Sequence, residues 1–274
     1  MAPVSEDPAL SAADPARLAA IAVDVARRAA AQVQASTVQT VTTKTSPIDL
    51  VTDLDGQVED LVTAALRAHT PEAGVLGEER GEVTGSSALR WLIDPIDGTS
   101  NLVAGLPGSA VSIGAELTGR VVAGAIVDIA SGEVFHAHDG GGAWLETGSG
   151  ASARTSRLSA STIGTPAHAT VGTGVGYDPA RRVDDAAIAG RILPACGSVR
   201  MFGSAALQLA WTAAGRLDAT YEFDLAPWDR AAGAVLCREA GARVRMPEGD
   251  EPGLTFVANP VLFDALLPLL DPPG

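Results

Sequence analysis

The sequence contains few cysteines, almost no lysine and no long hydrophobic run. Cys196 and Cys237 are its only cysteines in 274 residues. They are too few for a disulfide framework and lack the spacing of a zinc site, so we expect free thiols in a reducing compartment. Residues 1–7 lack the basic and apolar regions of a signal peptide, and no apolar stretch is long enough to span a bilayer. The sequence therefore predicts a cytoplasmic protein.

Positive charge is also scarce. The formal net charge is -14 at pH 7, which argues against binding to nucleic acid or to an anionic membrane surface. An anionic substrate would be repelled as well, unless bound metal ions reverse the local sign of the charge. Hydrophobic residues make up 46% of the chain, enough for a sizeable core.

The periodicity of apolar residues predicts interleaved helices and strands. Helices are expected at 14–33, 55–69, 203–214 and 228–240 and after Pro179 and Pro260, and strands at 74–76, 89–93, 111–115, 121–129, 133–138, 169–175, near 200 and at 217–222. The strands between 111 and 138 read as an antiparallel meander. We predict a layered α/β fold with a central antiparallel sheet. Residues 1–274 would form one domain, with possible subdomains at 1–150 and 151–274.

The segment Asp94-Pro95-Ile96-Asp97-Gly98-Thr99 is the most informative motif. It places two carboxylates between an expected strand and an expected helix, where like charges are costly unless a cation lies between them. Pro95 and Gly98 allow carboxylates, carbonyls and amides to converge over few residues. The segment therefore predicts a metal site, with Thr99 and free amides near a phosphate. An Asp-rich turn with a helix cap is the alternative.

Further acidic residues follow other expected elements. Glu78 comes directly after a strand, Asp55 lies near the start of a helix and Asp229 opens another. Taken singly, these residues also fit a charged turn or helix caps. Lys44 is the only lysine, since all other basic residues are arginine, which indicates a place that needs a compact ammonium group unless the lysine is there by chance.

Together these motifs resemble the inositol monophosphatase family of magnesium-dependent, lithium-sensitive sugar phosphatases. The resemblance runs from Lys44 to the last helix and rests on four motifs in order: Asp49-Leu50-Val51-Thr52 with Asp55, Gly77-Glu78-Glu79, Asp94 to Thr99, and Trp228-Asp229 followed by Ala231-Ala232-Gly233. It implies an α-β-α-β-α fold and a homodimer.

The resemblance also implies roles for single residues. The metal ligands would be Glu78, Asp94, the Ile96 carbonyl, Asp97 and Asp229, holding two or three Mg²⁺ ions. The catalytic residues would be Glu78, Thr99, Asp55 and Lys44. The substrate contacts would be Asp97, Gly98, Thr99, Gly203, Ser204, Ala205, Glu222 and Asp229. Ser204 replaces a threonine of the family pattern.

The predicted function is hydrolysis of a phosphate monoester by attack of a metal-activated water, with inositol 1-phosphate as the predicted substrate. Fructose 1,6-bisphosphate, a 3′-phosphoadenosine nucleotide and histidinol phosphate remain alternative substrates. A binding protein in a transcription or RNA-linked complex is the alternative from another class.

Overall fold

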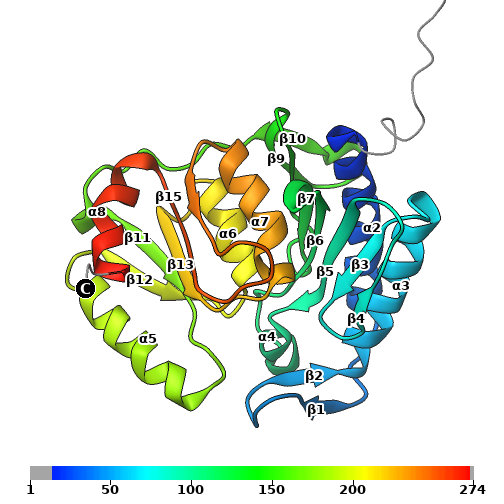
Figure 1. The fold of residues 1–274 in the computed structure, drawn as a ribbon, viewed down its shortest axis with the longest axis horizontal. Coiled ribbons are helices and arrows are strands. Elements are labelled where there is room, and N and C mark those ends of the chain that lie inside the picture. The colour runs from blue at the N-terminus through cyan, green and yellow to red at the C-terminus, as the bar shows by residue number, and fades with distance from the viewer. Residues whose placement is uncertain (1–13, 272–274) are drawn as a thin grey trace, which may run out of the picture.

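Helices and sheets alternate in five layers (Figure 1). The computed structural model describes residues 14–271, so residues 1–7, on which the expected absence of a signal peptide rests, lie outside the described range. From right to left in Figure 1, helices α2 and α3 cover one face of an eight-stranded sheet, and α6 and α7 cover the other. A five-stranded sheet and helices α5 and α8 complete the α-β-α-β-α order. The predicted fold class is confirmed.

The larger sheet has the strand order β10-β9-β8-β7-β6-β5-β3-β4. Its strands are β3 (Gly74–Gly77), β4 (Gly81–Val83), β5 (Leu89–Asp97), β6 (Ala110–Leu117), β7 (Arg120–Asp128), β8 (Val134–His138), β9 (Gly142–Thr147) and β10 (Arg154–Arg157). All neighbours pair antiparallel except β3 and β5, which are parallel. The predicted antiparallel meander is therefore confirmed, with one parallel pair beside it.

The smaller sheet is mixed and has the order β12-β11-β13-β15-β14. Its strands are β11 (Thr170–Thr173), β12 (Ser198–Met201), β13 (Ala219–Phe223), β14 (Arg243–Arg245) and β15 (Leu254–Ala258). A separate hairpin of β1 (Val41–Thr43) and β2 (Leu50–Thr52) lies beside α4 at the bottom of Figure 1.

The helices lie close to the ranges that the sequence predicts. They are α2 (Pro15–Ala35), α3 (Asp53–His69), α4 (Thr99–Ala104), α5 (Pro179–Ile192), α6 (Ala205–Ala213), α7 (Pro227–Glu239) and α8 (Pro260–Leu270). Asp14 and Asp178 each accept a hydrogen bond from the amide two residues on, and a proline occupies the first turn after each. Among residues 14–271, no helix is both long and apolar enough to cross a membrane.

Small residues on the helices let them pack closely on the sheets. In α2 the fully buried residues include Ala22, Val25, Ala26 and Ala29, which recur at helical spacing on the face toward the larger sheet. Helix α7 lies so close to β7 that a Cβ on Gly124 would be 2.8 Å from the Ala232 Cα. The position of α7 on the sheet is therefore fixed by contact between backbones.

Candidate functional site

A bulge in β5 brings the two aspartates of the central motif to the same face of the larger sheet. Residues three apart in a regular strand point to opposite faces. Here Asp94 pairs with Ser112 of β6 while Asp97 pairs with Ala110, so three steps on β5 oppose two on β6. The extra residue at Pro95–Ile96 shifts the alternation by one. Both carboxylates thus face the side of the sheet that α7 covers.

Helix α7 brings Asp229 to this face. A Cβ on Gly114 of β6 would lie 2.7 Å from the Ala231 Cβ, so only glycine allows the first turn of α7 to rest on the sheet there. The Ser112 hydroxyl donates to the Trp228 carbonyl at 3.4 Å. Ser112 is also the β6 partner of Asp94. The contact between Ser112 and Trp228 therefore brings Asp229 close to Asp94, although 135 positions separate them in the chain. Asp229 is the third residue of α7 and accepts a hydrogen bond from the Ala226 amide at 2.8 Å, so it supports the start of the helix without being its N-cap residue.

Glu78 reaches the site through the parallel pairing of β3 and β5. Gly77 is in register with Ile93, and the next amide, that of Glu78, donates to the Ile93 carbonyl at 3.3 Å. Glu78 therefore leaves β3 beside Asp94. The predicted strand-end position of this carboxylate is confirmed.

Lys44 lies between two glutamates. It sits in the turn of the β1–β2 hairpin, where the Asp49 carboxylate accepts hydrogen bonds from the amide and hydroxyl of Thr45. The Lys44 Nζ is 2.7 Å from Glu78 Oε1 and also contacts Glu79 Oε1. Burial alone would lower the pKa of Lys44, but the two carboxylates outweigh it and raise the pKa. The lysine is therefore a permanent positive charge in the site.

Asp55 is fully buried and links α3 to the central motif. Its Oδ1 is 2.9 Å from the Thr99 hydroxyl, which also lies 2.9 Å from the Ile96 carbonyl. Its Oδ2 accepts from the amide and hydroxyl of Thr52, forming the capping box of α3. Asp55 thus supports the start of α3 and also contacts Thr99.

Asp97 is held by residues from the other half of the chain. The Ser204 hydroxyl donates to Asp97 Oδ2 at 2.5 Å, and the Ala206 and Ala205 amides donate at 2.7 and 3.3 Å. The same hydroxyl accepts from the Leu207 amide at 3.2 Å and so caps α6. Ser204 thus orients a carboxylate, a role that the sequence did not indicate.

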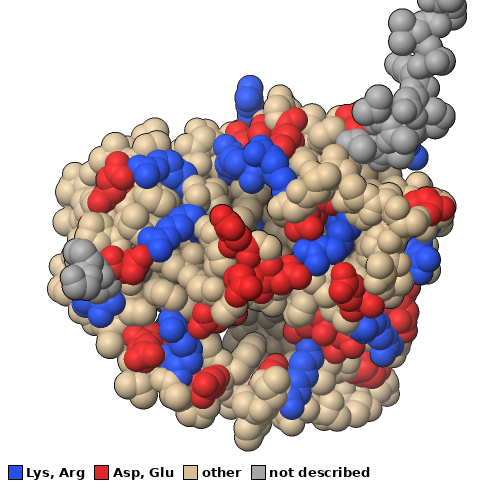
Figure 2. All heavy atoms as spheres, in the orientation of Figure 1, with Lys and Arg blue, Asp and Glu red and all other residues tan. Residues whose placement is uncertain are grey.

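Buried negative charge dominates the electrostatics of the site. Burial, followed by the charges of Glu78, Asp97 and Asp229, raises the pKa of Asp94 well above its usual value. Burial also raises the pKa of Glu78 to about 7 and, together with neighbouring carboxylates, that of Asp229 to about 8. Such a cluster of enclosed carboxylates is an unfavourable arrangement that a bound cation would relieve. On the surface, Figure 2 shows acidic side chains on both sides of a hollow below the centre of the view.

Glu222 lies at the edge of this cluster. Burial, then the charges of Asp97 and Asp229, raises its pKa well above the usual value, while Gln208 Nε2 donates to it at 2.6 Å. Gly174 leaves room for it, since a Cβ there would be 2.2 Å from Glu222 Oε2. Tyr177 follows in the same loop and is half exposed, and burial, then the charges of Asp49 and Asp97, raise the pKa of its hydroxyl group.

Comparison with known proteins identifies the family. The profile of the inositol monophosphatase family matches residues 14–268. The chain belongs to the inositol monophosphatase family. This member is 37% identical to the inositol-1-monophosphatase of Mycobacterium leprae over 278 residues, covering 94% of each chain.

A solved structure and a differently named relative are also similar to this family member. The structure of Mycobacterium tuberculosis SuhB matches with a TM-score of 0.81 and 38% identity, covering 94% of this chain and 97% of the other. The Nus factor SuhB of Pseudomonas aeruginosa is 36% identical and covers 82% of this chain and 83% of the relative. The predicted resemblance is therefore confirmed.

The fold brings together most of the residues that the family resemblance implies. Asp94, Asp97, Asp229, Glu78 and Asp55 interact electrostatically around one place. The roles of these residues as metal ligands or catalytic groups remain predictions, as do those of Lys44, Ile96, Gly98, Thr99, Gly203, Ser204, Ala205 and Glu222.

One buried polar residue near the site, Glu59, was missed by the sequence reasoning. It lies four residues after Asp55 on the same helix, and a glutamate on a buried helical face was the available signal.

Proposed function

We propose that this protein is a magnesium-dependent hydrolase that releases phosphate from inositol 1-phosphate. The observation that carries the proposal is the cluster of Asp94, Asp97, Asp229 and Glu78, set on one face by the β5 bulge and the close packing of α7. Family members are generally metal-dependent. The similar mycobacterial protein named inositol-1-monophosphatase supports the substrate.

The donor atoms fit Mg²⁺. All the proposed ligands, including the Ile96 carbonyl, offer hard oxygen donors, which Mg²⁺ prefers. Within residues 14–271, no three His, Cys, Asp or Glu side chains already stand close enough to hold an ion. Lys44 holds Glu78 by an ion pair in this arrangement. We therefore infer that carboxylates such as Glu78 turn toward the ion as it binds.

When bound, two or three Mg²⁺ ions would supply charge for the phosphate oxygens and a water of lowered pKa. The residues of the chain then set the geometry. Ser204 and two α6 amides orient Asp97, and Asp55 orients the Thr99 hydroxyl, which with Glu78 would align the attacking water. Lys44 stays protonated and limits the negative charge that the substrate meets.

Glu222 is the proposed contact for the hydroxyl groups of the inositol ring, together with the segment Gly203-Ser204-Ala205. Gln208 Nε2 donates a hydrogen bond to Glu222 Oε1 at 2.6 Å and so orients the carboxyl group. A half-buried carboxyl with a raised pKa offers hydrogen bonds to neutral hydroxyl groups without a full charge. This chemistry suits a polyol better than a second phosphate, so inositol 1-phosphate is favoured over fructose 1,6-bisphosphate.

The experiment is phosphate release from inositol 1-phosphate, fructose 1,6-bisphosphate, a 3′-phosphoadenosine nucleotide and histidinol phosphate, with Mg²⁺ and after its removal by chelation. We expect turnover only with Mg²⁺ and fastest for inositol 1-phosphate. Asp97→Asn should abolish turnover and keep the fold, because the change preserves shape and removes charge. Asp184→Asn on the exposed face of α5 is the matched control. Equal rates for wild type and Asp97→Asn would refute the proposal.

A second candidate is a binding role in a transcription complex, favoured by the relative named Nus factor SuhB. A pull-down separates the two, because a binding role would survive Asp97→Asn while catalysis would not. We also propose inhibition by lithium and a homodimer in the cytoplasm. Turnover measured in LiCl and the molar mass in solution test the first two of these points.

A further inference from the structure

Glu59 of α3 holds the backbone of the loop that carries Glu78. Its side chain is buried, with 1% of the residue exposed. Glu59 Oε2 accepts from the Glu79 amide at 2.7 Å, and Oε1 accepts from the Arg80 amide at 2.9 Å. Each carboxylate oxygen thus binds one backbone N–H group, which only a carboxylate at this place can do.

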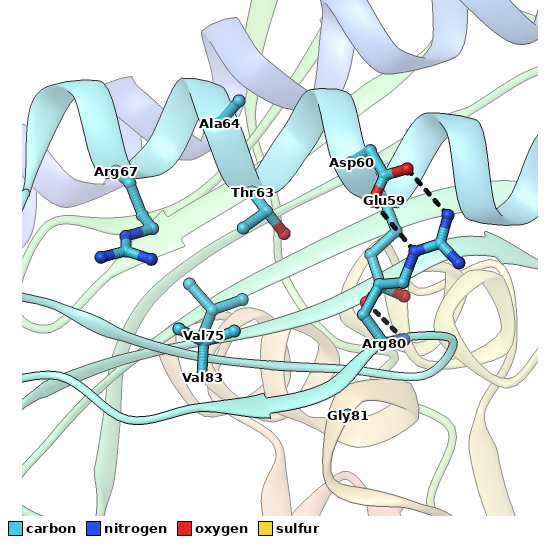
Figure 3. A pocket seen from close by; sticks show the side chains of 9 residues that line it. All are labelled: Glu59, Asp60, Thr63, Ala64, Arg67, Val75, Arg80, Gly81 and Val83. Atoms are coloured by element: carbon cyan, nitrogen blue, oxygen red, sulfur yellow. Dashed lines mark hydrogen bonds and ion pairs between the residues drawn. The ribbon is translucent and has the colours of Figure 1, made fainter.

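The loop is shaped around this carboxylate. A Cβ on Gly77 would lie 2.2 Å from Glu59 Oε1, closer than any real contact. Glycine at 77 therefore lets the Glu59 carboxylate approach the backbone just before Glu78. Figure 3 shows Glu59 pointing from α3 toward the Arg80 backbone, beside the exposed ion pair of Arg80 with Asp60.

Helix α3 connects this contact to the central motif. Asp55 and Glu59 are one turn apart on the same face of α3. Asp55 binds the Thr99 hydroxyl, while Glu59 binds the Glu78 loop. Lys44 contacts the side chains of Glu78 and Glu79 in the same loop. The loop is thus held through its backbone by Glu59 and through its side chains by Lys44.

We propose that Glu59 is a positioning residue that fixes the backbone of residues 77–80, so that the Glu78 carboxylate can turn from Lys44 toward Asp94 and Asp229 and bind Mg²⁺. This inference rests on the proposed function, because it takes Glu78 as a metal ligand. Glu59 itself touches neither metal nor substrate. Its loss should appear first as weaker metal binding, and only through that as lower turnover.

The test is calorimetric titration of metal-free protein with Mg²⁺. In Glu59→Gln one acceptor oxygen becomes an NH₂ group that opposes a backbone N–H, so the loop loses one of its two anchors. We expect the dissociation constant for Mg²⁺ to rise about tenfold or more, the size of effect seen for residues that orient metal ligands. KM for the substrate at saturating Mg²⁺ should change less than the Mg²⁺ requirement.

Asp60→Asn is the matched control. It is the neighbouring residue and holds the same loop, but through the exposed Arg80 side chain. Such exposed ion pairs contribute little, so we expect Mg²⁺ affinity within about twofold of wild type.

Gly77→Ala provides a second variant that keeps the Glu59 carboxyl and displaces it. We expect the same loss of Mg²⁺ affinity. Gly56→Ala is its control, because the added methyl would meet only the movable Arg80 guanidinium, at 2.9 Å. If neither Glu59→Gln nor Gly77→Ala folds, hydrogen exchange of the wild-type Glu79 and Arg80 amides decides. Slow exchange supports the two hydrogen bonds to Glu59.

Two outcomes overturn the inference alone. One applies when the wild type binds Mg²⁺: a folded Glu59→Gln variant then has the same dissociation constant for Mg²⁺. The other is exchange of the Glu79 and Arg80 amides as fast as in exposed loops. A wild type that neither binds Mg²⁺ nor hydrolyses any of the four substrates would instead refute the proposed function.

Discussion

Replacement of Ser204 by alanine tests how the two halves of the chain are joined at the site. The Ser204 hydroxyl donates to Asp97 and accepts from the Leu207 amide. Loss of a helix cap costs about 1 kcal/mol, and loss of a hydrogen bond to a carboxylate costs about 1.5 kcal/mol. The Ala206 amide still binds Asp97 at 2.7 Å and recovers part of this. We expect Ser204→Ala to lower the free energy of unfolding by about 2 kcal/mol.

Thermal unfolding with and without Mg²⁺ measures the effect. For a chain of 274 residues, 2 kcal/mol corresponds to a fall in Tm of roughly 3–4 °C. Ser204→Thr keeps the hydroxyl and should remain near wild type. Ser159→Ala is the control, because that exposed hydroxyl makes only a 3.4 Å contact with the adjacent carbonyl of Ala160. If Ser204→Ala melted within about 1 °C of Ser159→Ala, the assigned pair of hydrogen bonds would be wrong.

Two further predictions concern packing and pH. Gly114→Ala places a methyl group 2.7 Å from the Ala231 Cβ and should lower the free energy of unfolding by about 1–3 kcal/mol. Gly190→Ala in α5 meets nothing within 4 Å and should raise it by about 0.5–1 kcal/mol. If urea unfolding gave changes of the same sign for both variants, the close packing at Gly114 would be contradicted. The pKa of Glu222 is raised far above 4.5, so the unfolded chain loses this proton first and stability falls as pH rises above about 4.5. The Tm of metal-free Glu222→Gln, relative to that of wild type, should therefore increase as the pH is raised from 5 to 8. A difference in Tm that stays constant over this range would show that the pKa of Glu222 is not raised.

The sequence predicts much of the fold because most elements carry local signals. The capped starts of α2 and α5 and the alternating strands β6 to β8 are found as expected. The stretch 148–161 is rich in glycine, serine and alanine, which fits a loop or a subdomain boundary, yet it contains strand β10 (Arg154–Arg157). All four residues of β10 are exposed at the sheet edge, which leaves no alternation to detect. Strands β14 and β15 were missed as well, and β14 has only three residues.

The composition of the site was predictable, but its geometry was not. The four motifs identify the carboxylates, yet nothing in their spacing says that Asp94 and Asp97 share a face. That depends on the bulge in β5, which forms only when β5 pairs with β6 and which no short motif of β5 encodes. Likewise, the pairing of Ser204 with Asp97 spans 107 residues and follows from the packing of α6. Glu59 belongs to no short motif, and its role is visible only once the loop lies against it.

Lys44 gives this protein an unusual chemical property. Since no other lysine exists in the chain, reagents that modify amines can reach one side-chain position and the amino terminus. That one ammonium group is tied to two glutamates and is mostly shielded, with 22% of its side chain exposed. The rate at which Lys44 is acylated would therefore report whether Glu78 is paired with the lysine or has turned away from it. Occupancy of the site by a metal ion could thus be followed without introducing a label by mutation.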